Sequence, residues 1–184
     1  MIKRAIEFAA KAHHGQFRKG TDIPYIAHPF NVAAILAKSG VDDELVAAGA
    51  LHDTVEDVET VTIVDIRREF GDRVAAIVGG CSEPDKGATW QERKQHTINY
   101  LKSAPMDVKF VSCADKLDNM TSIARDYEAY GETLWQRFKV GMDDQAWYYS
   151  SLVESFDTPG FNETALFRAF QHQVGTVFNP AGCP

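Results

Sequence analysis

Apolar residues recur every three or four positions along most of the chain, which is the spacing that places them on one face of an α-helix. The first such stripe starts at Ile2 and ends near Gly15. The next begins at Pro29, a residue suited to the first turn of a helix, and ends at Gly40, a residue suited to the position after a helix. Long strict alternation of apolar and polar residues, the mark of a β-strand, is absent from the sequence. The pattern predicts a protein built from helices.

Helix-capping residues indicate where further helices begin. Asp42, Thr62 and Thr89 can each accept hydrogen bonds from the backbone of a first helical turn, and Thr62 and Thr89 have an acidic residue three positions later, as in a capping box. Stripes and caps together predict helices over residues 2–14, 29–40, 43–54, 63–70, 90–104, 107–127, 132–154 and 163–175. The segment 43–54 is small and apolar on most sides, so we expect it at the centre of the fold.

Length and composition indicate a soluble protein with one domain. The 184 residues suffice for a sizeable core, and 45% of them are hydrophobic. Neither an apolar run long enough for a membrane span nor a signal-peptide pattern occurs, so we expect a cytoplasmic protein that does not contact membranes. Three cysteines without CxxC spacing favour reduced thiols over disulfides or a zinc site. The predicted fold class is all-α, a compact single-domain helical bundle.

The charge balance argues against a nucleic-acid partner. Lys and Arg number 19 against 26 Asp and Glu, which gives a formal net charge of -7. Binding a nucleic-acid backbone requires a dense basic face. A small anionic ligand is compatible with this balance if local positive charge meets it.

Acidic residues crowd around one histidine where the predicted central helix ends. His52, Asp53, Glu56 and Asp57 lie within six positions, and on a continuous helix His52 would share a face with Glu56, and Asp53 with both later acids. Charges this close repel one another unless a cation neutralises them or a pKa rises. A divalent metal ion is the simplest compensation.

Two other segments could complete a metal site. His28 stands directly before the helix predicted from Pro29, and Asp115 lies among apolar neighbours in the segment 107–127. Together with His52 and Asp53 they would form a shell of nitrogen and oxygen ligands suited to manganese, iron or zinc. A cation in such a shell can generate hydroxide near neutral pH.

Simpler interpretations of these residues stay open on spacing alone. A histidine near a helix terminus is commonly a favourable partner for the helix dipole. Asp115 could instead form a salt bridge with Lys109 or Lys116.

Five segments follow one another in the order and at the spacings of a known enzyme family. They are GQFRKGTDIPYIAHP, GALHDTVED, FGDRVAAIVGGCSEPDK, ERKQHTINYL and VKFVSCADKLDNM. In these segments the chain resembles the HD-domain hydrolases of guanosine penta- and tetraphosphate, and most of all the stand-alone small alarmone hydrolases. The resemblance is strong over residues 1–125 and looser over 126–184, and it implies a single HD hydrolase domain over residues 1–184.

The resemblance implies a role for each matching residue. It implies His28, His52, Asp53 and Asp115 as ligands of one divalent ion, usually manganese. Glu56 and Asp57 match the catalytic acidic pair of the family. Arg18, Lys19 and Asn119 match residues that contact the nucleotide substrate. Without the resemblance, Arg18, Lys19 and Asn119 would be interpreted as ordinary surface residues.

The activity implied is metal-dependent removal of the 3′-diphosphate from the guanosine alarmones of the stringent response, giving GDP or GTP and pyrophosphate. Alternatives on the same scaffold are hydrolysis of adenosine alarmones and removal of the 2′-phosphate of NADPH. An alternative of another class is a nucleotide sensor without turnover, which Glu56 and Asp57 argue against because extra acids make phosphate binding more costly. The chain has no room for the synthetase domain of the long relatives, so we expect degradation of the signal, with a homo-oligomer possible.

The remaining aromatic residues and histidines are less informative. Trp147, Tyr148 and Tyr149, preceded by Arg137, could form a wall that stacks on a base, although such residues at helical spacing are more often core. The other histidines, namely His13, His14, His96 and His172, are interpreted as structural or surface residues.

Overall fold

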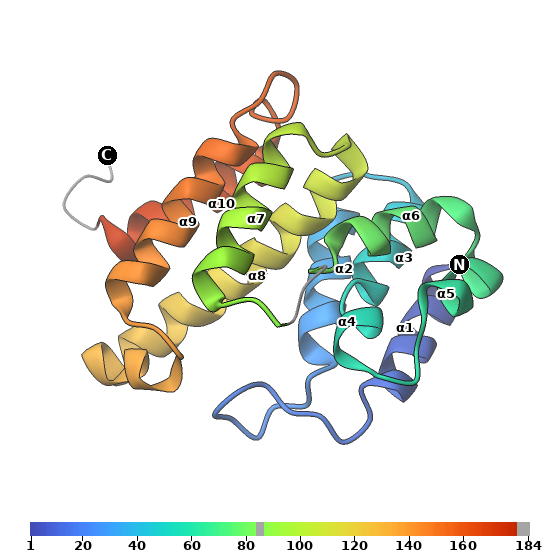
Figure 1. Ribbon diagram of the computed structural model, residues 1–184, viewed down its shortest axis with the longest axis horizontal. Coiled ribbons are helices and arrows are strands. Elements are labelled where there is room, and N and C mark those ends of the chain that lie inside the picture. Colours follow the sequence, from blue (N-terminus) through green and yellow to red (C-terminus); the bar gives the residue numbers. More distant parts are fainter. Residues whose placement is uncertain (84–86, 180–184) are drawn as a thin grey trace. The chain divides into compact units, whose positions relative to one another are not determined.

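The protein is helical throughout the part that its computed structural model describes, residues 1–83 and 87–179 (Figure 1). The helices are α1 (Ile2–Ala12), α2 (Ala27–Lys38), α3 (Asp43–Leu51), α4 (Thr54–Asp57), α5 (Ile63–Phe70), α6 (Asp72–Cys81), α7 (Trp90–Ser103), α8 (Met106–Tyr130), the 3-10 helix η1 (Gly131–Arg137), α9 (Met142–Phe156) and α10 (Ala165–Phe178). Extended pairing in these ranges is limited to an isolated bridge between Phe17 and Pro24. The all-α prediction is therefore confirmed. Across these ranges, every helix is too short or too polar to cross a bilayer.

Contacts divide the chain into two units. The first is Met1–Pro84 with Pro105–Asp115, and the second is Asp85–Ala104 with Lys116–Pro184, so α8 contributes to both. The prediction that residues 1–184 form one domain stays a prediction.

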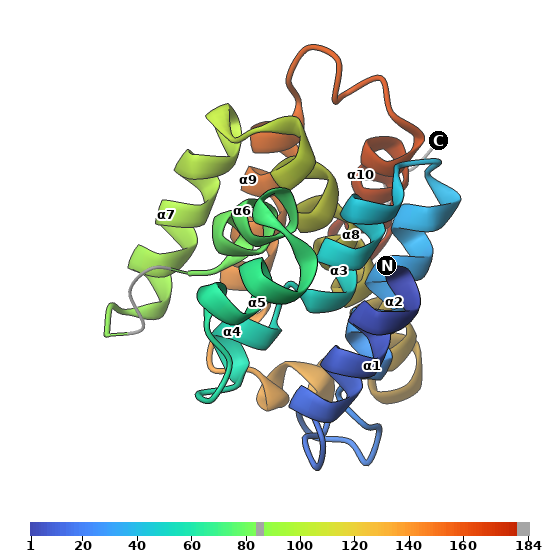
Figure 2. The same cartoon turned by 90° about the vertical axis from the view of Figure 1, so that its right-hand side faces the viewer.

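Helix α3 is the centre of the first unit, and the burial predicted for most of its sides is confirmed. Every residue from Leu45 to Leu51 is buried, and α1, α2 and α6 all pack against α3. The three helices α1, α2 and α3 lie side by side in both Figure 1 and Figure 2. Small side chains allow this close packing, because four of these seven buried positions are Ala or Gly. The chain therefore reaches His52 from a helix whose last seven residues are all buried.

Gly49 sets the distance between α2 and α3. A Cβ at this position would overlap Leu36 Cδ1 and would lie 3.3 Å from Val32 Cγ1. Both neighbours are completely buried and have little space into which to move. We expect Gly49→Ala to lower the free energy of unfolding by about 1–3 kcal/mol, the usual cost of overpacking a core. Urea denaturation followed by circular dichroism measures the change.

Gly175→Ala in α10 is the matched control for this substitution. A Cβ at Gly175 would meet no atom within 4 Å, so alanine there is expected to be neutral or to stabilise by up to about 1 kcal/mol. Equal stabilities of the two variants would show that α2 and α3 do not approach as closely as described.

The second unit is built around α9. Helices α7 and α10 both pack against α9, and the Ser155 hydroxyl donates a hydrogen bond to the Ile98 carbonyl across the α7–α9 contact (Figure 1). Phe156, Phe161 and Phe170 are completely buried here, with ring centroids of Phe156 and Phe170 5.7 Å apart. These aromatic side chains form the core of the unit.

The capping residues predicted from the sequence act as expected. The Asp42 carboxylate accepts hydrogen bonds from the Glu44 and Leu45 backbone amides at the start of α3. Thr62 and Thr89 each form a complete capping box with the acidic residue three positions later, Asp65 and Glu92 respectively. Local side-chain chemistry therefore fixes these three helix starts.

Two of the predicted helices are interrupted in the structure, and helix α6 was not predicted. The segment 132–154 is interrupted after η1, and α9 starts at Met142, where Gly141 is the N-cap and Asp143 and Asp144 provide negative charge in the first turn. The predicted helix 43–54 ends at Leu51 and a separate α4 begins at Thr54. Helix α6 has no capping side chain at its start and carries two glycines near its end, so the sequence offered little signal for it.

Candidate metal centre

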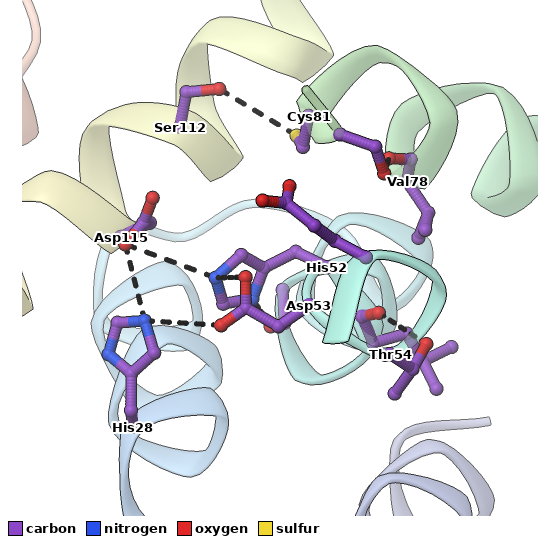
Figure 3. A network of polar contacts seen from close by, with 12 residues as sticks. His28, His52, Asp53, Thr54, Val78, Cys81, Ser112 and Asp115 are labelled. Atoms are coloured by element: carbon purple, nitrogen blue, oxygen red, sulfur yellow. Dashed lines mark hydrogen bonds and ion pairs between the residues drawn. The ribbon is translucent and has the colours of Figure 1, made fainter. Parts of the chain in front are cut away.

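The four residues predicted to bind a metal ion come together in the first unit. His28 comes from the first turn of α2, His52 and Asp53 from the turn between α3 and α4, and Asp115 from α8, as Figure 3 shows. The sequence predicted that His28 stands directly before a helix that starts at Pro29. This prediction is wrong, because α2 begins at Ala27 and His28 lies inside it. Helix α3 ends directly before His52 and Asp53 and so positions these two residues together.

Short distances connect the ligand atoms of these residues. One atom each of His28, His52 and Asp53 lie within 4.8 Å of one another. Asp115 Oδ1 is 3.2 Å from His28 Nε2 and 3.9 Å from His52 Nε2. His28 and His52 are 3% and 4% exposed, so water cannot solvate the imidazoles freely. Figure 3 shows the two rings and two carboxylates facing a common space.

The tautomer of His52 is set by its backbone contact. Nδ1 lies 2.8 Å from the Gly49 carbonyl oxygen, and because a carbonyl can only accept, Nδ1 carries the proton and donates it. The buried Nε2 has no hydrogen-bond partner among the described residues, although Asp53 Oδ1 lies 3.2 Å away. A backbone carbonyl that holds one imidazole nitrogen so that the other can bind a metal ion is a common arrangement around metal sites.

The electrostatic field of the cluster favours positive charge. Burial alone would lower the pKa of His52, but the carboxylates of Asp53 and Asp115 outweigh it and raise this pKa to about 9. Burial likewise disfavours ionisation of Asp53, yet His52 and His28 hold the pKa of Asp53 well below its ordinary value. The ionised Asp53 carboxylate, with Asp115 Oδ1 3.2 Å from His28 Nε2 on the other side, therefore creates a place where a cation is stabilised.

These residues fit a divalent cation. Two imidazoles and two carboxylates offer the mixed nitrogen and oxygen ligands that manganese, iron and zinc accept. The Nε2 atom of His52, buried and without a hydrogen-bond partner in the described chain, supplies an independent observation for the same conclusion.

The acidic pair lies on the short helix α4. Glu56 is half-buried and its Oε2 accepts a hydrogen bond of 3.1 Å from the Glu83 backbone amide, whereas Asp57 is exposed. Because α3 ends at Leu51, His52 and the two acids do not share one continuous helix, and the predicted common face is wrong for His52. Asp53 does retain the helical relation, since its carbonyl accepts from the Asp57 backbone amide at 2.8 Å.

Arg18 and Lys19 lie on a loop between α1 and α2. The loop is closed by the Phe17–Pro24 bridge and by a hydrogen bond of 2.8 Å from the Arg18 backbone amide to the Ile23 carbonyl. Arg18 is half-buried and Lys19 is exposed. The loop therefore presents two cations next to the segment that leads into His28.

Asn119 and the aromatic residues 147–149 belong to the second unit. Asn119 lies in the part of α8 that follows Asp115, so its relation to the metal cluster stays a prediction. Tyr148 and Tyr149 are buried, as expected for core residues, and Trp147 is half-buried with its ring centroid 6.1 Å from that of Trp90.

Arg137, whose role the sequence left open, is engaged within the second unit. Its guanidinium lies 4.1 Å from the centroid of the Tyr130 ring and 3.3 Å from the Asp126 carboxylate.

Two residues beside the cluster were missed from the sequence. The Tyr25 hydroxyl donates a hydrogen bond of 2.8 Å to Asp53 Oδ2, and the His13 ring lies against Tyr25 with centroids 4.9 Å apart. The position of Tyr25 three residues before His28 was the available signal, because both lie on one turn entering α2. His13 is only 2% exposed, which agrees with a structural role.

Comparison with known proteins points to one family. A family model described as HD domain matches residues 5–138, which is more than half of the chain. The chain is 37% identical over 128 residues to the guanosine-3′,5′-bis(diphosphate) 3′-pyrophosphohydrolase MESH1 of Danio rerio, covering 68% of this chain and 70% of that protein.

Longer proteins share the same region. A GTP pyrophosphokinase of Streptomyces coelicolor is 40% identical over 125 residues, which is 66% of this chain but 14% of that protein. The guanosine-3′,5′-bis(diphosphate) 3′-pyrophosphohydrolase of Aquifex aeolicus is 38% identical over 124 residues, 18% of its length. The chain thus spans less than a fifth of these longer relatives.

Two solved structures share the fold. A crystal structure of a Listeria monocytogenes EGD-e protein superimposes with a TM-score of 0.75 at 38% identity, covering 86% of this chain and 99% of that one. A metazoan orthologue of SpoT, described as hydrolysing ppGpp, superimposes with a TM-score of 0.78 at 27% identity, covering 95% of this chain and 93% of that one.

Proposed function

Since this chain belongs to the HD domain family and is related to the 3′-pyrophosphohydrolases of guanosine bis(diphosphate), we propose that it removes the 3′-diphosphate from guanosine alarmones in a manganese-dependent reaction. The observation that carries the proposal is the buried cluster of His28, His52 and Asp53, whose ligand atoms lie within 4.8 Å of one another. Hydrolysis breaks the bond between the 3′ oxygen and the adjacent phosphorus. Its products are pyrophosphate and GDP or GTP.

The metal ligands in this proposal are His28, His52, Asp53 and Asp115. A divalent cation bound there supplies Lewis acidity that lowers the pKa of water and offsets negative charge on the phosphoryl oxygens. The chain contributes the Gly49 carbonyl, which accepts from Nδ1 of His52, and an Asp53 carboxylate that stays ionised. Both features favour binding of a divalent ion before the substrate arrives.

Glu56 and Asp57 are the proposed proton-transfer pair. They lie on α4, which directly follows the proposed metal ligands His52 and Asp53. The backbone amide of Glu83 donates a hydrogen bond to one oxygen of Glu56 and holds it in place. A carboxylate at this position can orient the attacking water and accept its proton. The exposed Asp57 can pass that proton to solvent.

Arg18 and Lys19 are the proposed contacts for the diphosphate, with Asn119 a further proposed contact to the nucleotide. The loop that carries Arg18 and Lys19 leads into Tyr25, whose hydroxyl donates to Asp53, and this connection supports the proposal. Local positive charge of this kind lets a chain with a net charge of -7 bind a polyanion.

A panel of substrates tests the proposal. The protein is incubated with manganese and 3′-diphosphorylated guanosine nucleotides, their adenosine analogues or NADPH, and products are resolved by anion-exchange chromatography. We expect pyrophosphate release from the guanosine nucleotides, and its loss on chelation with EDTA. Preferential turnover of the adenosine analogues would contradict the proposed guanosine substrate and favour adenosine alarmones. Release of phosphate from NADPH without pyrophosphate release would favour the NADPH phosphatase activity. Nucleotide binding without product would favour a sensor.

Replacing Glu56 by glutamine isolates the proton-transfer role. Gln keeps an oxygen that can accept from the Glu83 amide but removes the basic carboxylate, so we expect turnover to fall about 10²-fold or more while manganese affinity stays close to the parent value. Initial rates on the best substrate of the panel measure the effect. Glu59→Gln is the control, because it removes the same charge from an exposed side chain three residues later, and it should keep the parent rate. Unchanged turnover in both variants would remove Glu56 from the mechanism.

A further inference from the structure

Tyr25 is not one of the proposed metal ligands, but its side chain contacts one of them, Asp53. Its hydroxyl donates a hydrogen bond of 2.8 Å to Asp53 Oδ2, which also lies 3.5 Å from His28 Nε2. The other oxygen of Asp53 lies 3.2 Å from His52 Nε2. The Asp53 carboxylate is thus held between two imidazoles and one phenol, and Tyr25 is the member of this set that approaches from outside the cluster.

The ring of Tyr25 is held in place. The His13 ring lies against it at a centroid distance of 4.9 Å, and the His28 ring meets it nearly edge-on at 6.0 Å. The backbone amide of Tyr25 donates to the Gln16 carbonyl at 2.9 Å. Such support fixes the direction of the hydroxyl toward Asp53 and limits alternative rotamers.

Gln16 extends this support to the acidic pair. Its Oε1 lies 2.7 Å from His13 Nδ1, and its Nε2 donates a hydrogen bond of 3.2 Å to the Asp57 carbonyl. One chain of contacts therefore connects α4, the Gln16 side chain, the His13 ring and the Tyr25 ring.

We propose that Tyr25 is a positioning residue of the metal centre, whose hydroxyl orients the Asp53 carboxylate so that its oxygens are directed at the space between His28 and His52. This inference rests on the metal-dependent function proposed above. Hydrogen bonds to ligating carboxylates commonly change metal affinity 10–100-fold when removed. Tyr25→Phe removes the hydroxyl and keeps the ring against His13.

Manganese titration of the metal-free proteins tests the proposal. Calorimetry gives the dissociation constant for manganese, and thermal unfolding with EDTA and with manganese gives the rise in Tm that the ion causes in each variant. We expect Tyr25→Phe to bind manganese roughly 10–100-fold more weakly than the parent and to show a smaller rise in Tm. Because each rise starts from the variant's own metal-free value, a general loss of stability does not imitate the effect.

Tyr127→Phe is the matched control. The Tyr127 hydroxyl also donates to a carboxylate, Glu132 at 2.6 Å, but on the surface of the second unit. This variant should bind manganese as the parent does. Parent-like affinity in Tyr25→Phe, or equal weakening in both variants, would overturn the positioning role while leaving the proposed function intact. A parent protein that binds no manganese would overturn both.

Discussion

Replacing Asp53 with asparagine is expected to lower alarmone hydrolysis on the order of 10³-fold, the scale on which loss of a key electrostatic group in an active site acts. Asparagine has nearly the shape of aspartate and can still accept the hydrogen bond from Tyr25. What it loses is the negative charge beside His28 and His52, which would stabilise the proposed metal ion. Manganese affinity and the manganese-induced rise in Tm should fall together with the rate.

Asp72→Asn is the control for this experiment, because Asp72 is also an ion-paired aspartate, bonded to Arg67 at 3.0 Å, but its side chain is 92% exposed. This variant should keep the parent rate and the parent manganese affinity, since exposed ion pairs contribute little. An Asp53→Asn variant with a rate within threefold of the parent would show that Asp53 is not required for the metal-dependent reaction.

Truncating Phe156 to alanine is expected to lower the free energy of unfolding by about 3–5 kcal/mol, the range found for large aromatic side chains deleted from a core. Phe156 is completely buried, and it meets the rings of Phe161 and Phe170 at centroid distances of 5.5 and 5.7 Å. Removing it leaves a cavity lined by rigid aromatic rings that cannot collapse easily. Urea denaturation monitored by circular dichroism gives the change.

Phe30→Ala provides the comparison, because Phe30 lies on α2 with 52% of its surface exposed. Its truncation should cost less than about 1 kcal/mol, since little apolar area returns to water. If Phe156→Ala were as stable as Phe30→Ala, the packing described for α9 and α10 would be wrong.

Local chemistry explains which parts of the fold could be predicted. The starts at Asp42, Thr62 and Thr89 depend on hydrogen bonds within three residues, so the sequence contains all the information needed. The break at residues 138–141 has one local signal, since Gly141 is the N-cap of α9. The turn at His52 and Asp53 has none of this kind, because Asp53 at the N-cap of α4 makes no capping side-chain hydrogen bond.

The candidate site shows the same division. The choice of His28, His52, Asp53 and Asp115 came from spacing together with family resemblance, and the structure brings all four together. Tyr25 was missed although it stands three residues before His28, because its relevance arises from one hydrogen bond to Asp53. His13 was interpreted only as a structural or surface residue, and its contact with the Tyr25 ring was not foreseen. Metal ligands can be recognised in a sequence because they are drawn from a few residue types, such as His and Asp. Residues that orient those ligands can be of many types, so the sequence marks them poorly.

Anomalous diffraction from crystals soaked in manganese shows whether the cluster binds a metal ion. We expect one manganese peak within coordination distance of His28 Nε2, His52 Nε2 and the carboxylates of Asp53 and Asp115. Diffraction that shows these side chains ordered, with no anomalous peak among them at saturating manganese, would contradict this expectation.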